Sequence, residues 1–403
     1  MNTLVLNAGS SSQKTALFEL GAEASVDPVP PLWEGKLDWD GSKEILSVKN
    51  SAGKKIHADN PASGDRELSA EQLLQNLWSS PTAVLRSPSQ IQAIGHRIVH
   101  GGPDLTQPTI VTPAVRQAIA DVSSIAPLHN QAGLQGIDLA TKLFPSVPQV
   151  AVFDTGFHRT LPLEAKVYAG PYSWYEQGIR RYGFHGINHE YCAHRAAQML
   201  RRDVASLKII TCHLGNGCSL AAIEGGKSID TTMGFTPLEG LMMGTRSGSI
   251  DPGILTHLMR TDAARAEDLD AILNRQSGLL GISGLSGDMR DILTAMQDGN
   301  HRARLAFDLF IHRLCACIGS MAASLKGLDV LVFTAGIGEN SPEVRQEVCD
   351  RLQFLGVAID QAKNSSLKPD TDLSSEGTAR VLVIRAQEDW AIARECIRML
   401  PSR

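Results

Sequence analysis

The sequence lacks an excess of positive charge. Its 403 residues include 38 Lys and Arg against 43 Asp and Glu, which gives a formal net charge of −5. Proteins that bind nucleic acid or an anionic membrane usually carry a clear basic excess. The composition therefore argues against both partners and favours work on small molecules.

Long apolar runs and paired cysteines are missing as well. No stretch approaches the roughly 18 apolar residues of a membrane span, and Met1–Asn7 has neither the basic region nor the apolar core of a signal peptide. The seven cysteines form an odd set without a CxxC pair, which is typical of reduced thiols. We expect a cytoplasmic protein with no membrane partner and no disulfides.

Three familiar catalytic signatures are also absent. The sequence has no G-x-x-x-x-G-K-[ST] phosphate loop, no G-x-S-x-G nucleophile elbow and no H-E-x-x-H motif. A covalent serine hydrolase is therefore disfavoured. A zinc enzyme is disfavoured too, although His185 and His189 have the spacing of two ligands on a helix.

The sequence does contain a repeat: the same order of predicted strands and turns occurs in both halves of the chain. Thr3–Leu6 and Lys14–Leu20 are typical of two strands around a polar turn, and about half a chain later Leu207–Cys212 and Cys218–Ile223 repeat that order. Stretches with apolar residues at three- and four-residue spacing follow in both halves: Asn130–Phe144, His189–Leu200 and His301–Leu325. We expect two related α/β halves with a ligand cleft between them.

Two segments fall outside this repeat. Residues 51–90 are rich in Ser, Pro, Lys and Asp, with one helix-like stretch at Ala70–Trp78, and we interpret them as a surface elaboration. The C-terminal stretch Asp389–Leu400 is typical of a helix. We expect it to pack back on the first half, which would make that domain discontinuous.

Two glycine-containing turns could bind phosphate. Asn7–Lys14 offers backbone N–H groups, hydroxyls and a cation directly after a strand, although a serine-rich turn is the plainer alternative. Gly336–Asn340 precedes Ser341 and Pro342, an N-cap and a first-turn proline that predict the start of a helix. A helix N-terminus favours anions, but a merely tight connection remains the alternative.

Three side chains stand in glycine-flanked positions: Arg97, His185 and Arg246. Any one of them could make an ordinary loop ion pair. Their joint presence favours a site that stabilises anionic groups. Asp154 and Glu388 each follow an apolar run and could hold Mg²⁺ through water, or could instead act as capping or ion-pairing carboxylates.

Together these motifs resemble the acetate kinase (acetokinase) family. The segments that carry the resemblance are, in chain order, Val5–Lys14, Gly95–Gly102, Phe153–His158, Tyr182–Gly186, His213–Gly217, Asp230–Gly248 and Phe333–Asn340. The match runs from Leu4 to about Arg394. The Asp230–Gly248 block is highly specific.

The resemblance implies an α/β fold of two RNase H-like, actin-like ATPase domains with a nucleotide cleft between them. We expect residues 1–154, completed by a helix at 389–403, to form one domain and residues 155–388 to form the other. The implied reaction is a reversible, Mg²⁺-dependent transfer of phosphoryl from ATP to acetate, which gives ADP and acetyl phosphate and feeds acetyl-CoA formation. Mn²⁺ is an alternative ion, and the family resemblance also implies a homodimer.

The same resemblance assigns roles to individual residues. It makes Asp154, His185, Arg246 and Arg97 catalytic, with Arg97 also contacting the substrate carboxylate. The apolar pocket for the methyl group comprises Val99, Leu128 and Pro237, and the metal positions are Asn7 and Glu388. The nucleotide-binding positions are Ser10, Ser12, Lys14, His213, Leu214, Gly215, Asn216, Gly217, Asp288, Met289, Arg290, Gly336, Ile337, Gly338, Glu339 and Asn340.

One departure from the family pattern concerns the metal position. The family usually has Thr-Asn-Glu-Glu where this chain has Ala386-Gln387-Glu388-Asp389. Glu388 is kept, but its surroundings differ. We expect direct in-line transfer, with the role of Asp154 as base or positioning group left open. Propionate kinase is the near alternative, and a non-enzymatic actin-like nucleotide switch is the far one.

Overall fold

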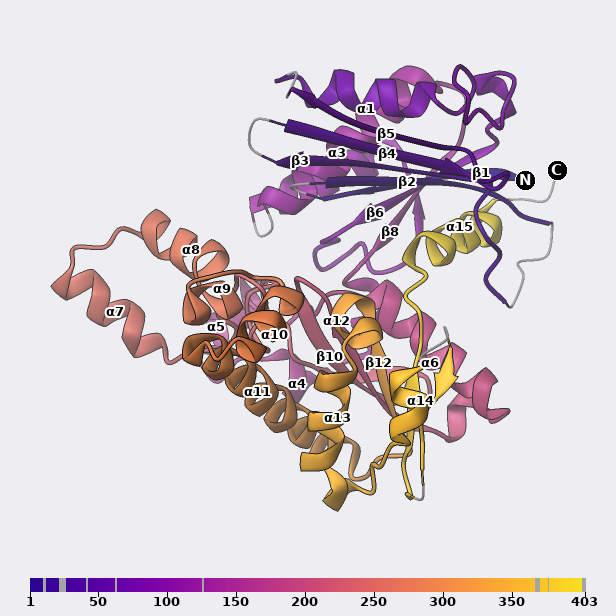
Figure 1. Ribbon diagram of the computed structural model, residues 1–403. Helices are drawn as coiled ribbons and strands as arrows, with labels where there is room; N and C mark the ends of the chain where they lie inside the picture. The colour runs from indigo at the N-terminus through magenta and orange to yellow at the C-terminus, as the bar shows by residue number, and fades with distance from the viewer. Residues whose placement is uncertain are drawn as a thin grey trace. The chain divides into compact units, whose positions relative to one another are not determined.

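The computed structural model describes residues 1–9, 12–21, 27–40, 43–61, 64–124, 127–366, 370–375 and 377–400. The chain divides into two compact units (Figure 1). The first comprises Met1–Gly156 and Gln387–Arg403, and the second comprises Phe157–Ala386. The C-terminal segment therefore belongs to the same unit as the N-terminus.

The first unit is built on an eight-stranded sheet in the order β5-β4-β3-β2-β1-β6-β8-β7. β1 runs parallel to β6 and β6 parallel to β8, while the remaining neighbours are antiparallel. The strands are β1 Asn2–Ala8, β2 Ser12–Glu19, β3 Trp33–Asp40, β4 Lys43–Asn50, β5 Lys55–Pro61, β6 Ala93–Ile98, β7 Thr109–Ile110 and β8 Gln149–Phe153. The helices are α1 Arg66–Gln75, α2 Pro113–Asp121, α3 Pro127–Leu143 and α15 Glu388–Met399.

Helices cover both faces of the central strands of this sheet. α3 packs against β1 and β6, and α15 packs against β1, β6 and β8. Successive residues of a strand point to opposite faces. A Cβ built on Gly95 would lie 2.6 Å from Ile392 of α15, whereas one built on Gly133 of α3 would lie 2.8 Å from Ile98. Position 95 of β6 thus faces α15, and position 98 faces α3.

The second unit has a six-stranded sheet in the order β11-β10-β9-β12-β14-β13. The strands are β9 Lys208–Leu214, β10 Cys218–Glu224, β11 Lys227–Thr231, β12 Val330–Thr334, β13 Thr371–Asp372 and β14 Arg380–Val383. The helices are α4 Leu163–Lys166, α5 Tyr172–Glu176, α6 Gly186–Leu200, α7 Pro252–Thr261, α8 Ala266–Arg275, α9 Gly278–Ser283, α10 Met289–Gln297, α11 His301–Leu325, α12 Ala335–Asn340, α13 Pro342–Arg351 and α14 Gln361–Ser365. Short 3₁₀ turns lie at Pro88–Gln90, Val122–Ser124, Gly156–Thr160, Val204–Ser206 and Gln353–Leu355.

The two sheets share one topology. The order β3-β2-β1-β6-β8 in the first unit matches β11-β10-β9-β12-β14 in the second, with an antiparallel three-stranded meander followed by two parallel strands in each case. The repeated strand order predicted from the sequence is confirmed. The fold is the α/β class with two RNase H-like units.

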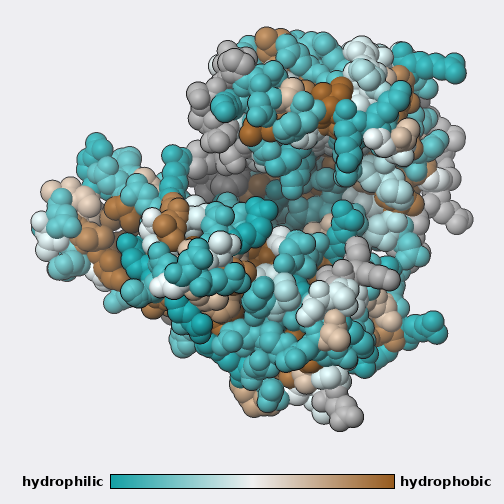
Figure 2. All heavy atoms as spheres, in the orientation of Figure 1, coloured by the Kyte–Doolittle hydropathy of each residue, from teal (hydrophilic) through white to brown (hydrophobic). Residues whose placement is uncertain are grey.

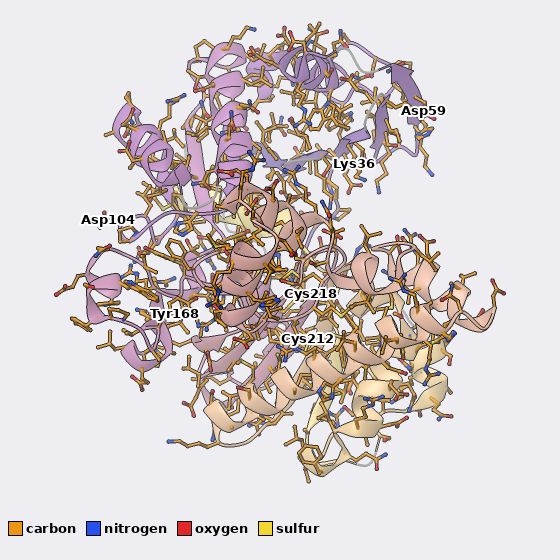
Figure 3. All side chains as sticks on the ribbon, turned by 90° about the vertical axis from the view of Figure 1, so that its left-hand side faces the viewer. Lys36, Asp59, Asp104, Tyr168, Cys212 and Cys218 are labelled. Carbon is orange, nitrogen blue, oxygen red and sulfur yellow. The ribbon has the colours of Figure 1, made fainter. Side chains whose placement is uncertain are left out.

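The interpretation of residues 51–90 as a surface elaboration is wrong for much of that segment. β5 is an edge strand of the first sheet, and in α1 and the turn after it Leu73, Leu74 and Leu77 are fully buried. Lys36 and Asp59, on β3 and β5, are labelled in Figure 3. Charged residues on alternate positions of these strands give the segment a polar composition, although the other face packs on the core.

Cys212 and Cys218 lie in neighbouring strands inside the second unit (Figure 3), and both are buried. α11 spans His301–Leu325, so the helix predicted for that stretch from its apolar spacing is confirmed. By length and composition it could cross a membrane. It packs against α9, α10, α13 and β10, as a core helix does.

Candidate active site

Arg97 and Asp154 form a buried ion pair in the first unit. Arg97 lies near the end of β6, and Asp154 directly follows β8, the parallel neighbour of β6. Nε of Arg97 is 3.1 Å from both oxygens of Asp154, and Nη2 donates to Oδ2 at 2.6 Å. The side chains are 18% and 1% exposed. The guanidinium is thus held in one orientation while part of it stays accessible.

Asn7 extends this contact toward the C-terminal helix. Its Oδ1 accepts from Nη1 of Arg97 at 3.3 Å, and its Nδ2 donates to Oδ1 of Asp389 at 2.9 Å. Asp389 lies in the first turn of α15. Sequence reasoning did not assign it to the site, although two adjacent acids at the start of a helix were the available signal.

The charges in this cluster oppose one another. Burial lowers the pKa of Arg97, but Asp154 and Glu388 outweigh burial and raise it, so the guanidinium stays charged. Burial raises the pKa of Asp154 against the effect of Arg97, and it also raises the pKa of Asp389. The charge of Glu388 adds to both increases. The region therefore holds more negative charge than Arg97 alone balances.

A hard divalent cation fits this donor set. Within the described residues, no three His, Cys, Asp or Glu side chains are grouped as a complete metal site. Mg²⁺ typically takes only one or two carboxylates and completes its shell with water and substrate phosphates. Glu388, Asp389 and the amide oxygen of Asn7 are the groups that could hold it.

The remaining site residues predicted in the first unit are Lys14, Ser12, Val99, Ser10 and Leu128. Lys14 lies on β2 opposite Asn7 and is exposed, and the carbonyl of Ser12 accepts from the N–H of Gly9 at 2.8 Å. Val99 is buried. Ser10 and the side chain of Leu128 lie outside the described residues.

His185 anchors the site of the second unit. It is the residue before α6 and has a φ of 56°, a left-handed conformation that is costly for a residue with a Cβ. Its Nδ1 lies 2.8 Å from Oγ of Ser219 on β10. Its ring stacks on that of His213 with centroids 4.0 Å apart and planes 11° apart. These contacts hold the imidazole despite the local strain.

His213 is fixed from the other side. Nδ2 of Asn188, on α6, lies 2.8 Å from its Nδ1. Neither Asn188 nor Ser219 was singled out from the sequence. Their signal was weak, because buried Asn and Ser residues are common in α/β cores.

Arg246 and His185 meet at Gly217. A Cβ built on Gly217 would lie 3.4 Å from Nη1 of Arg246 and 3.5 Å from Nε2 of His185. Nη1 of Arg246 also donates to the carbonyl of Pro237 at 3.2 Å. The missing side chain at position 217 leaves both donor groups close to the loop that follows β9, where an anion could accept from them.

A polar network braces the loop that carries Pro237 and Arg246. The hydroxyl of Tyr168 donates to Glu239 and accepts from the N–H of Phe235 at 2.8 Å. Nη2 of Arg181 donates to Glu239 at 2.7 Å. Burial and then Glu239 raise the pKa of Tyr168, so its hydroxyl remains a donor. The loop is therefore tied to the segment 168–181.

A cavity of about 490 Å³ in the second unit brings together many of the predicted nucleotide-binding residues. It is lined by Gly215, Asn216, Gly287, Asp288, Met289, Arg290, Leu293, Gly336, Ile337, Asn340 and Ser341. Asp288 caps α10 and forms an ion pair with Arg290, and this pairing lowers its pKa. The volume and polar rim suit a nucleotide-sized ligand.

The predicted nucleotide-binding segment after β12 forms the short helix α12, and two of its residues make structural hydrogen bonds. Oε1 of Glu339 accepts from the N–H groups of Ala335 and Ala386, each at 2.9 Å. The carbonyl of Gly338 accepts from Nη1 of Arg345 at 2.8 Å. Glu339 and Gly338 therefore hold α12 in place, while Gly336, Ile337 and Asn340 line the cavity. Ser341 precedes Pro342 at the start of α13, which confirms the predicted helix start.

The chain matches a known family over most of its length. The sequence model of the Acetokinase family matches residues 2–394. An acetate kinase of Trichormus variabilis is 54% identical over 404 residues, which cover 99% of this chain and 100% of that protein. An acetate kinase of Gloeobacter violaceus is 55% identical over 399 residues, 98% of each chain.

Solved structures agree with this match. The Porphyromonas gingivalis acetate kinase superimposes with a TM-score of 0.90 at 38% identity and covers 99% of this chain and 100% of its own. A propionate kinase from Francisella tularensis reaches 0.88 at 37% identity, with 99% and 100% coverage.

Proposed function

This chain belongs to the acetokinase family, and from that membership we propose that it is an acetate kinase. The reaction is the reversible transfer of the γ-phosphoryl group of ATP to a carboxylate oxygen of acetate, which gives acetyl phosphate and ADP. The observation that carries the proposal is the meeting of Arg246 and His185 at Gly217, beside a nucleotide-sized cavity.

The chemistry requires concentrated positive charge, because acetate and the triphosphate repel each other. Arg97 binds the acetate carboxylate in the orientation fixed by Asp154. Arg246 and His185 donate to the oxygens of the transferring phosphoryl group, whose charge spreads in the transition state. No covalent enzyme intermediate is needed, since positioning and charge stabilisation account for most of this catalysis.

Asp154 acts as a positioning group in this proposal. A carboxylic acid such as acetate is already ionised at pH 7, so no base is required in the forward direction. The contacts of Asp154 with Arg97 use both of its oxygens. They support its role in aiming the guanidinium.

We assign the metal position to Asn7, Glu388 and Asp389. Mg²⁺, or Mn²⁺ in its place, supplies charge neutralisation on the phosphate oxygens when bound. Asp389 stands where the family usually has a second glutamate, and its Oδ1 accepts from Nδ2 of Asn7 at 2.9 Å. This contact keeps a second carboxylate beside Asn7.

A hydroxylamine trap for acyl phosphate tests the function. The protein is incubated with ATP, Mg²⁺ and one acid from a panel of one to four carbons. We expect acetyl hydroxamate as the main product. An absence of hydroxamate with every acid would refute the proposal.

Propionate kinase is the second candidate, because a propionate kinase is among the structures that match this fold over its full length. The two substrates differ by one methylene, worth about 1–3 kcal/mol in an apolar pocket. Val99, a buried residue of the first unit, is our candidate for a wall of that pocket. A kcat/KM for propionate above that for acetate would reverse the assignment.

We further propose that the enzyme is a cytoplasmic homodimer that feeds acetyl-CoA formation. Hydrophobic atoms gather over the part of the second unit that carries α7 (Figure 2), where Ile254 and Met259 are about half exposed. Exposed apolar patches mark protein interfaces. Light scattering should give twice the 43.4 kDa of the chain, and a monomer mass would contradict the proposal.

A further inference from the structure

The strained His185 is the end of a buried hydrogen-bond chain. Its Nδ1 is 2.8 Å from Oγ of Ser219, and the same Oγ is 2.8 Å from Nε2 of His189. Nδ1 of His189 is in turn 2.7 Å from Oγ1 of Thr211. Thr211, His189 and Ser219 are fully buried, so water does not compete for these bonds.

Only one direction of donation along this hydrogen-bond chain gives every hydroxyl and ring proton an acceptor. Burial lowers the pKa of His189 well below its usual value, so its ring carries a single N–H. If that proton were on Nδ1, it would point at Thr211 and leave the hydroxyl proton of Thr211 without an acceptor among the described residues. With the proton on Nε2, Thr211 donates to His189, His189 donates to Ser219, and Ser219 donates to His185.

We propose that Thr211, His189 and Ser219 are positioning residues that hold His185 in the tautomer with its proton on Nε2. Nε2 is the nitrogen close to Gly217 and Nη1 of Arg246. This hydrogen-bond chain thus directs the Nε2–H donor of His185 to the place beside Gly217 where Nη1 of Arg246 also donates. A proton on Nδ1 of His185 would instead face the hydroxyl proton of Ser219.

This inference rests on the proposed function for its use in catalysis, but the tautomer can be observed without turnover. Protein labelled with ¹⁵N-histidine has 12 histidines, and the signals of His185 are assigned by their loss in His185→Gln. Long-range ¹H–¹⁵N correlation spectra distinguish a ring protonated on Nε2 from one protonated on Nδ1. We expect the Nε2–H pattern in the wild type and a mixture in Ser219→Ala.

Kinetics provide the second readout, with matched controls. Ser219→Ala should lower kcat by about 10- to 100-fold with little change in KM, as loss of a partner that orients a functional histidine does. Ser69→Ala is the control, because Ser69 is also buried and donates to Glu44 at 2.8 Å in the first unit, away from this hydrogen-bond chain. Thr211→Val removes the first donor at nearly constant volume, and Thr211→Ser should restore the rate.

The outcomes separate the two proposals. An Nδ1–H pattern for His185 in the wild type, or equal kcat losses in Ser219→Ala and Ser69→Ala, would overturn the inference. If the wild type forms no acyl phosphate but shows the Nε2–H pattern, the proposed function falls and the tautomer assignment stands.

Discussion

At the scale of single residues, glycine neighbours were an informative signal. Arg97, His185 and Arg246 were singled out because glycines flank them, and Gly217 shows why this matters, since a side chain there would crowd both donors. The residues that orient them were not predictable. Ser219, Asn188 and Asp389 lie far along the chain from their partners, and only the folded backbone brings them together.

The contribution of Arg246 can be measured by its removal. Arg246→Ala should lower kcat by about 10²–10³-fold, because one donor to the developing charge is worth about 2.7–4 kcal/mol. The circular dichroism spectrum should be unchanged, since the hydrogen bonds of this side chain to the carbonyl of Pro237 and to Sδ of Met243 stay within residues 237–246. A near-normal kcat would remove Arg246 from the mechanism. Arg304→Ala, at an exposed ion pair with Asp308 on α11, is the matched control for loss of an arginine.

Two buried histidines predict how stability depends on pH. Burial lowers the pKa of His96 and of His158 from 6.5 to about 4, so the folded state resists protonation while the unfolded state accepts a proton. Stability is therefore full above pH 6.5 and falls as the pH drops toward 4. At pH 5 the loss should be about 2 kcal/mol for each histidine.

Urea unfolding at pH 7 and pH 5 measures this loss. His96→Gln should reduce the difference between the two pH values, whereas His312→Gln, at an exposed position on α11, serves as the control. Equal unfolding midpoints of the wild type at both pH values would contradict the prediction.

At the scale of elements, the central strands of the two sheets were easier to predict than β5, an edge strand of the first sheet. β1, β2, β9 and β10 are buried on both faces and show as apolar runs around polar turns. The composition of β5 and α1 predicts surface segments because most of their residues face water. Only the folded chain brings Leu73 and Leu74 of α1 into the core, with Ile56 of β5 partly buried against it.

Gly95 controls how closely α15 approaches β6. A Cβ there would lie 2.6 Å from Cγ2 of Ile392 and 2.9 Å from Sγ of Cys396. Gly95→Ala should therefore lower the stability of the first unit by about 1–3 kcal/mol, as overpacking typically does. Because α15 begins at Glu388, the KM for Mg²⁺ should rise as well.

Calorimetry and Mg²⁺ titration of the rate test this prediction. Gly319→Ala on α11 is the control, because its added Cβ meets nothing within 4 Å. Ile392→Ala combined with Gly95→Ala should recover part of the stability by removing the clash. If Gly95→Ala behaved like Gly319→Ala, close packing at β6 would not be what limits this position.

At the scale of the whole molecule, the two ends of the chain share one unit. The helical pattern of Asp389–Leu400 led us to expect packing on the first half, and the structure places Gln387–Arg403 with Met1–Gly156. The second unit is continuous from Phe157 to Ala386. Each unit has its own sheet and its own polar cluster. A destabilising substitution in one unit therefore need not unfold the other.

Trp390 offers a test of this independence. Its side chain is 1% exposed and belongs to α15, so Trp390→Ala should destabilise the first unit by about 3–5 kcal/mol. Limited proteolysis should then cut residues 1–156 first. Calorimetric titration should still detect ADP binding, because the cavity lies wholly within the second unit. Phe354→Ala, at a position that is 77% exposed, is the control for loss of an aromatic side chain. Loss of ADP binding together with cleavage throughout residues 157–386 would mean that the units unfold as one, because a lesion confined to α15 could reach the cavity only through such coupling.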